Sequence, residues 1–185
     1  NNDWDMVRYR FQRKIGYLTE EKNGHIIKVS IDTLNGGDGV PEKSTERIES
    51  EFEIRTYIQK LQYALEHGAQ INFQIHRRID DLRNEKYTNQ YTVNQLFPDE
   101  DPVTALKREL RLLTVEEYMR TVKDLRFPNR SEMREFGRVY NGKDEVYIKI
   151  RVELLGAYGI TTTFVMSFHF AEKPFKPEMF PYRKG

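Results

Sequence analysis

The sequence predicts an α+β fold in which helices pack on an antiparallel β-sheet, with an N-terminal extension of hairpin and helix. Two observations predict it. In the middle of the chain, apolar residues recur every three or four positions, which is the helical period. In the last third, apolar and polar residues alternate in segments separated by glycine-containing turns, which is typical of an antiparallel meander.

The first part of the chain is predicted to form a β-hairpin. Residues 6–18 alternate loosely between apolar and polar side chains, and 26–31 have the composition of a returning strand. The dipeptide Asn23-Gly24 between them is a strong signal for a two-residue hairpin turn. A glycine-rich stretch follows and indicates a flexible connection. We therefore expect an extension over residues 1–43 and one α+β domain over residues 44–185.

Apolar spacing of three to four residues begins at Ser44 and predicts an amphipathic helix that stops at Gly68. Short strands are expected at residues 71–75 and 91–93, where apolar and β-branched residues cluster.

Two more helices are expected before the last third of the chain. An acidic turn flanked by prolines, residues 98–102, suits the start of a helix that carries Leu106, Leu110 and Leu113. Residues 114–125 are expected to form the next helix, because they begin with Thr-Val-Glu-Glu, the spacing of a capping box.

The last third is predicted to hold three antiparallel strands: residues 134–140, 145–155, and a third after the turn at 156–159. The second strand alternates, so its polar face is expected to carry Tyr147, Lys149 and Arg151. In the third strand we expect one apolar face and one polar face. The apolar face would carry Ile160, Phe164, Met166, Phe168 and Phe170, and the polar face Thr161, Thr163, Ser167 and His169.

Composition excludes several classes of site. The chain of 185 residues has no cysteine, which excludes disulfides, cysteine-ligated zinc and a thiol nucleophile. Its four histidines are scattered without metal-ligand spacing, so we expect neither a metal nor a cofactor. No apolar stretch approaches the roughly 20 residues that span a bilayer, and the N-terminus is acidic and polar. We expect a cytoplasmic protein with no membrane partner.

Charge is unevenly distributed along the chain. Residues 126–185 contain eleven Lys and Arg against seven Asp and Glu, whereas residues 1–125 contain nineteen against twenty-two. A basic segment of this kind favours a polyanionic partner, because Lys and Arg contacts to phosphates supply most non-specific affinity for nucleic acids.

The predicted polar sheet face brings together a histidine, a tyrosine and two cations: His169, Tyr147, Lys149 and Arg151. This set suits metal-free RNA cleavage, in which a base deprotonates the ribose 2′-OH, cations stabilise the phosphorane and an acid protonates the leaving oxygen. The alternative is an ordinary solvated sheet face, with His169 as a hydrogen-bonded structural residue.

Three motifs, in the order helix, strand, strand, carry a resemblance to a known family. They are Leu-Thr-Val-Glu-Glu-Tyr-Met-Arg at 113–120, Glu-Val-Tyr-Ile-Lys-Ile at 145–150 and Val-Met-Ser-Phe-His at 165–169. Together they resemble the motility quorum-sensing regulator (MqsR) family of toxin ribonucleases, over about a third of the chain. The resemblance implies a small α+β ribonuclease fold, akin to the RelE and barnase-like nucleases, that cuts RNA without a metal.

The resemblance also implies site residues. The family's helix lysine falls on Arg120, its strand tyrosine on Tyr147, a lysine near the end of the last strand on His169, and a glutamine near Arg134 or Glu135. Only the tyrosine is identical. An arginine keeps the charge of the lysine but has no titratable proton, whereas a histidine is a better acid–base group.

Roles follow for these residues. We expect His169 to transfer a proton, Tyr147 to position it or the substrate, and Arg120 with Lys149 to hold phosphate. Arg134 or Arg151 would extend this clamp, and Glu135 is a candidate base. Two alternatives stand beside these roles: Arg120 as a surface helix residue paired with Glu116 or Glu117, and Glu135 as an ordinary exposed strand residue.

The expected activity is that of a metal-independent endoribonuclease that cleaves by attack of the 2′-OH. It would act as a toxin on mRNA, restrained by an antitoxin, or as an inhibitor that trims the guide RNA of a CRISPR ribonucleoprotein. The alternative is a non-catalytic anti-CRISPR protein or another inhibitor module that binds RNA or protein through the sheet face.

Overall fold

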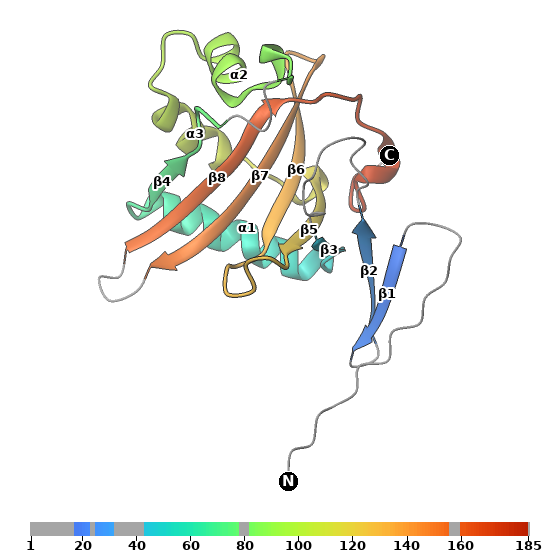
Figure 1. The fold of residues 1–185 in the computed structure, drawn as a ribbon. Helices are drawn as coiled ribbons and strands as arrows, with labels where there is room; N and C mark the ends of the chain where they lie inside the picture. Colours follow the sequence, from blue (N-terminus) through green and yellow to red (C-terminus); the bar gives the residue numbers. More distant parts are fainter. Residues whose placement is uncertain (1–16, 23–24, 32–42, 78–81, 156–159, 185) are drawn as a thin grey trace.

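The computed structural model describes residues 17–22, 25–31, 43–77, 82–155 and 160–184 (Figure 1). Its strands are β1 (Tyr17–Lys22), β2 (His25–Ile31), β3 (Lys43–Arg47), β4 (Gln70–Phe73), β5 (Tyr118–Asp124), β6 (Met133–Tyr140), β7 (Asp144–Leu155) and β8 (Ile160–Phe170). Its α-helices are α1 (Glu51–Glu66), α2 (Asn89–Leu96) and α3 (Pro102–Arg111). Single 3₁₀ turns occur at η1 (Glu85–Tyr87), η2 (Val115–Glu117) and η3 (Pro177–Met179).

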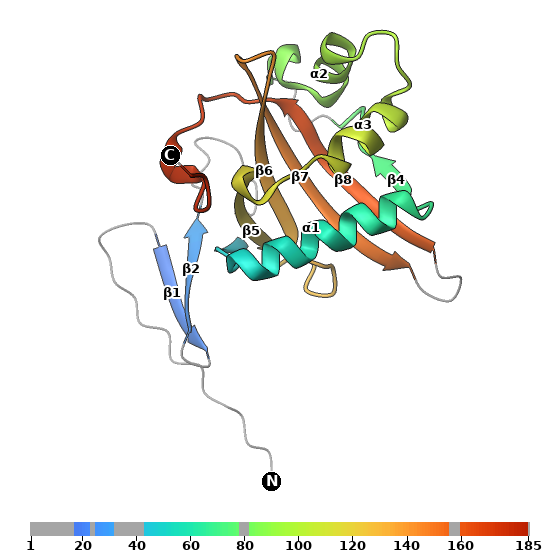
Figure 2. The same ribbon diagram turned by 180° about the vertical axis from the view of Figure 1, so that it is seen from behind.

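The described strands form one sheet in the order β1-β2-β3-β5-β6-β7-β8-β4. Neighbouring strands are antiparallel except for β4, which runs parallel to β8 at the edge. Helix α1 crosses one face of the sheet, behind it in Figure 1 and in front of it in Figure 2. The predicted α+β fold is therefore confirmed. Because β3 pairs with both β2 and β5, the sheet continues across residue 43, and a separate extension before that residue stays a prediction.

The expected first helix is confirmed, but it begins later than Ser44 because residues 43–47 pair as β3. Ser50 caps α1 and forms a capping box with Glu53, whose carboxylate accepts from the Ser50 N–H at 2.7 Å. The helix ends before Gly68, whose φ of +85° is the left-handed conformation that favours glycine after a helix. Its buried stripe, Ile54, Ile58, Leu61 and Leu65, faces the sheet.

The strand expected at residues 91–93 is wrong, since these residues lie in α2. Side chains of this helix bind the backbone of β8 and so outweigh local strand propensity. Asn89 donates to the Met166 carbonyl at 3.0 Å and accepts from the Phe168 N–H at 2.9 Å, and Thr92 accepts from the Phe170 N–H at 2.8 Å. The helix after the acidic turn is confirmed as α3, which Asp101 caps.

The helix expected over residues 114–125 is also wrong. Glu117 accepts from the Thr114 N–H at 2.9 Å, as in a capping box, but only the 3₁₀ turn η2 forms before the chain enters β5. Val115, Tyr118, Met119 and Val122 are spaced as on a helix, yet all are buried. Val115 lies in η2, and the other three lie in a strand that pairs on both sides, between β3 and β6. Such a strand loses the simple alternation that identifies exposed strands.

The core lies between α1, α3 and one face of the sheet. The alternation expected for β7 is confirmed, because Val146, Ile148 and Ile150 are fully buried in this core. The odd-numbered residues of β7 therefore project from the opposite face.

The predicted division of the last strand, β8, into an apolar and a polar face is correct only for its second half. Lys149 pairs with Ser167, but Ile150 pairs with Val165, so β8 has one extra residue at Met166. Before this bulge the two faces exchange: Val165 lies in the core, whereas Phe164 packs against Arg151 on the other side. Phe164 and Met166 are thus not on the apolar face, and Thr163 is fully buried instead of exposed on a polar one.

Candidate functional site

The sheet face opposite α1 carries a pocket of about 760 Å³. Its floor is formed by polar side chains of the central strands, and its rim by the connection between β5 and β6 and by the segment after β8. Five residues expected at the site line this pocket together with Glu135: Arg120, Tyr147, Lys149, Arg151 and His169.

Glu135 is the buried centre of the polar cluster, with 2% of its side chain exposed. Its Oε2 accepts from Nε of Arg120 at 2.6 Å, and its Oε1 lies 3.1 Å from Nζ of Lys149. The phenol of Tyr147 lies beside the same carboxylate and helps to lower its pKa. Burial alone would raise the pKa of Glu135, but these partners outweigh it and hold the pKa below its usual value. Glu135 is therefore a carboxylate at neutral pH, and it is not the exposed strand acid that was the alternative.

Tyr147 lies between this carboxylate and the imidazole of His169. Tyr147 and His169 are directly paired across β7 and β8, and their ring centroids are 5.4 Å apart with the planes tilted by 38°. Burial and the adjacent Glu135 raise the pKa of Tyr147 well above 10, so the phenol keeps its proton and acts as a donor.

His169 is 7% exposed, and its Nδ1 lies 2.9 Å from the carbonyl oxygen of Phe170. Because a carbonyl only accepts, Nδ1 carries the hydrogen, and Nε2 is the nitrogen that gains or loses a proton. Burial lowers the pKa of His169 below 6.5, and the positive charges of Arg83 and Arg77 lower it further, against the opposing effect of the Phe170 carbonyl. His169 thus loses its proton at a lower pH than an ordinary histidine does.

Arg120 belongs to β5 and not to a helix, so the expected match to a helix lysine loses its structural basis. It pairs with Glu135 and, through Nη1, with Oε1 of Glu46 at 2.8 Å, not with Glu116 or Glu117. Two carboxylates from neighbouring strands therefore fix the guanidinium at the pocket wall.

The two further arginines expected to bind phosphate differ in position. Arg151 lines the pocket, where its guanidinium carbon lies 4.3 Å from the ring centre of Phe164. Arg134 projects from the other face of β6 and is not part of the pocket. It binds the buried carboxylate of Glu49 through two hydrogen bonds of 3.0 and 2.8 Å and stacks on Tyr57 of α1. The structure gives Arg134 a role in attaching the helix to the sheet.

The pocket contains cations that the sequence did not single out: Arg77, Arg83, Arg126, Arg130, Lys173 and Lys176. They lie on connections that only the folded chain brings together, and the excess of basic residues after Leu125 was the sole signal for four of them. Among the described residues, nine Lys and Arg line the pocket against four Asp and Glu, so this lining is strongly cationic.

The segment after β8 reaches the pocket because β6 has a glycine beneath it. A Cβ at Gly137 would lie 2.7 Å from Cε2 of Phe175 and 2.8 Å from Cζ of Phe180. Only a residue without a side chain lets these two rings cross the strand this closely. The N–H of Phe175 also donates to Glu145 at 2.8 Å, which holds Lys173 and Lys176 at the rim.

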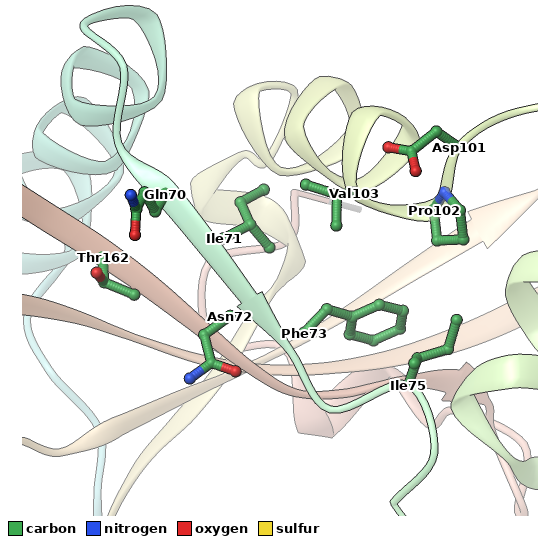
Figure 3. Close-up of a pocket in the computed structure, with 9 residues that line it drawn as sticks. All are labelled: Gln70, Ile71, Asn72, Phe73, Ile75, Asp101, Pro102, Val103 and Thr162. Atoms are coloured by element: carbon green, nitrogen blue, oxygen red, sulfur yellow. The ribbon is translucent and has the colours of Figure 1, made fainter.

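A second pocket, of about 590 Å³, lies beside the edge strand β4 (Figure 3). Its lining is mainly aliphatic, aromatic and amide side chains, and none of the described residues that line it is a Lys or Arg. The carboxylate of Asp101, the one acidic group among its described lining residues, caps α3 and accepts from the Thr104 N–H at 2.9 Å. The described lining of this pocket thus offers no positive charge to bind phosphate, so the larger pocket is the candidate site.

Within the described residues, no three His, Asp or Glu side chains are grouped closely enough to hold a metal ion. The helices of the described part include none that is long and apolar enough to cross a membrane. Comparison with known proteins finds no matching family model, no matching curated protein and no matching solved structure. The resemblance to the MqsR family therefore stays a prediction, and the pocket itself carries the functional argument.

Proposed function

We propose that the protein is a metal-independent endoribonuclease whose reaction site is the cationic pocket. One observation carries the proposal: a buried carboxylate that is ionised at neutral pH lies beside a tyrosine–histidine pair, all on one concave sheet face. Base, positioning group and acid thus come from the adjacent strands β6, β7 and β8.

The reaction is an internal transfer of the phosphoryl group. Glu135 takes the proton from a ribose 2′-OH, and the 2′ oxygen attacks the adjacent phosphorus. The bond from phosphorus to the 5′ oxygen breaks, and Nε2 of protonated His169 gives its proton to that oxygen. The products are a 2′,3′-cyclic phosphate and a free 5′-OH, so protons and charges balance without another reactant.

The ion pairs of Glu135 link the negative charge of the base to the negative charge that develops on the phosphorane. Before the proton transfer, Arg120 and Lys149 neutralise the carboxylate. Once Glu135 accepts a proton, its negative charge disappears while negative charge develops on the phosphorane. The same two cations then stabilise the transition state from fixed positions, which requires little reorganisation of the site.

A second candidate function is RNA binding without cleavage, as in a non-catalytic inhibitor module. The observation that favours it is the low exposure of Glu135, whose carboxylate already has three partners within the protein. In that case Glu135 would serve to hold Arg120 and Lys149 in place for phosphates of the ligand.

End analysis of RNA products in EDTA separates the two functions. Purified protein is incubated with RNA labelled at both ends, and the new ends are identified by their response to phosphatase and to acid. We expect fragments with 2′,3′-cyclic phosphate and 5′-OH ends. RNA that stays intact while it remains bound would contradict the nuclease and support the binding module. Repeating the assay with free mRNA and with a CRISPR ribonucleoprotein identifies the RNA substrate.

A further inference from the structure

The connection between β5 and β6 presents an aromatic ring to the pocket. Phe127 lines the rim, is 41% exposed, and is absent from the hydrophobic core. The guanidinium carbon of Arg130 lies 4.0 Å from its ring centre, and that of Arg126 lies 5.6 Å away. Proteins that bind single-stranded nucleic acids commonly combine an exposed ring with adjacent guanidinium groups, because unpaired bases stack on aromatic rings and on the planes of Arg side chains.

Electrostatic contacts join this aromatic rim to the proposed reaction site. Asp124, at the end of β5, binds Arg126 at 2.7 Å, and its pKa is lowered first by Arg126 and also by the charge of Lys149. Lys149 in turn binds Glu135. Lys149 and Phe127 line the same pocket, so an RNA with a phosphate at Lys149 can place a neighbouring nucleotide at the rim.

The side chains on the floor of the pocket support the same inference. Lys149 and Arg151 project from one face of β7, and residues two apart on a strand are spaced by about 6.6 Å. Nη1 of Arg151 lies 3.8 Å from the sulfur of Met133, the first residue after the connection that carries Phe127. Cations thus continue from the catalytic cluster toward the aromatic rim.

We propose that Phe127 is a stacking platform for an unpaired base of single-stranded RNA, next to the nucleotide that is cleaved. The inference rests on the proposed function for the identity of the ligand, and it adds its substrate class. A base in a duplex is stacked and paired and has no free face for Phe127, and a pocket of about 760 Å³ is of the size that encloses a small ligand and not a double helix. Base-paired RNA should therefore bind poorly.

Binding of an uncleavable oligonucleotide tests this role apart from catalysis. The probe is a fluorescent tetraadenylate with 2′-O-methyl groups, which has no nucleophile, and its matched partner is an abasic tetramer with the same phosphates. Phe127→Leu should lower the affinity for the tetraadenylate about tenfold and leave the affinity for the abasic tetramer unchanged, since stacking of one base contributes roughly this factor. Phe127→Trp, which keeps an aromatic ring, should retain the affinity that Phe127→Leu loses. A 12-base-pair RNA duplex should compete only weakly with the tetraadenylate.

Phe52→Leu is the matched control, because Phe52 is 79% exposed on α1 and does not line the pocket. It should bind both probes as the unmodified protein does. Equal affinity of Phe127→Leu and unmodified protein for tetraadenylate would overturn the inference, as would an equal loss for both probes. Absence of cleavage together with a base-specific loss in Phe127→Leu would refute the nuclease and leave the stacking platform standing.

Discussion

Tyr147 and His169 face each other across β7 and β8, with their ring centres 5.4 Å apart, and the same phenol lies beside the carboxylate of Glu135 on β6. One side chain thus links the carboxylate and the imidazole. This arrangement determines which groups should titrate, which should be needed for stability and which should contact RNA.

Glu135→Gln should destabilise the fold by about 3 kcal/mol at pH 7, because it leaves Arg120 and Lys149 without their buried counter-charge. The pKa of Glu135 is lowered by folding, so its ionisation stabilises the fold above pH 4.5, and this contribution is lost as the pH falls through the folded pKa. The difference from the unmodified protein should therefore shrink on acidification. Urea unfolding at pH 7 and pH 3 measures it.

The exposed carboxylate of Glu178 supplies the control for that comparison. Glu178→Gln should change the free energy of unfolding little at either pH. If Glu135→Gln lowers the free energy of unfolding by the same amount at pH 3 and pH 7, the charge of the carboxylate is not what stabilises the cluster.

The pH profile of cleavage should have an acidic optimum. The base, Glu135, is active when ionised, and its pKa lies below 4.5; the acid, His169, is active when protonated, and its pKa lies below 6.5. The value of kcat/KM should therefore fall about tenfold per pH unit above pH 6.5, since the free enzyme then loses the proton of His169. Initial rates at low RNA concentration measure it, and a constant rate from pH 6 to 9 would refute the assignment of His169 as the acid.

Lys149→Ala should weaken RNA binding and make it less dependent on salt. Each phosphate contact to a single strand contributes about 0.7 to the slope of log K against log salt, so the slope should decrease by about that amount. Fluorescence anisotropy at several salt concentrations measures the slope. Lys60→Ala, an exposed position on α1, is the control. If Lys149→Ala and Lys60→Ala give the same slope, Lys149 makes no phosphate contact.

Gly137→Ala should displace the segment after β8, since its Cβ would meet the rings of Phe175 and Phe180 at less than 3 Å. We expect a loss of about 1–3 kcal/mol in stability and faster chymotrypsin cleavage after Phe175, which is followed by a lysine. Adding Phe175→Ala should recover part of the stability, because one of the two opposing rings is then gone. Unchanged stability and an unchanged cleavage rate in Gly137→Ala would mean that the segment does not need this close approach.

Where residues near in sequence determine the structure, the sequence was sufficient. The alternation of β7, together with that of the second half of β8, predicted that Tyr147, Lys149 and His169 would face the same side, and all three line the pocket. The acidic turn at residues 98–102 likewise located the start of α3, which Asp101 caps. In these elements local pattern and tertiary packing favour the same conformation.

Where distant contacts decide, the sequence was misleading. Strand β5 is buried on both faces between two partners, so its apolar residues imitate a helical period. The bulge at Met166 is held by Asn89, 77 residues earlier, and no local pattern in β8 announces it. Arg77, Arg83 and Phe127 reach the pocket on connections, whose positions depend on the whole sheet.

Single-turnover cleavage by His169→Ala in EDTA tests the central claim most directly. Circular dichroism and thermal unfolding first establish that the variant is folded, because His169 lies on the pocket face and not in the hydrophobic core. We predict that the unmodified protein produces 2′,3′-cyclic phosphate ends and that the folded variant is at least about a hundredfold slower, the usual value of a general acid. Cleavage by folded His169→Ala at the unmodified rate would contradict the proposed reaction site.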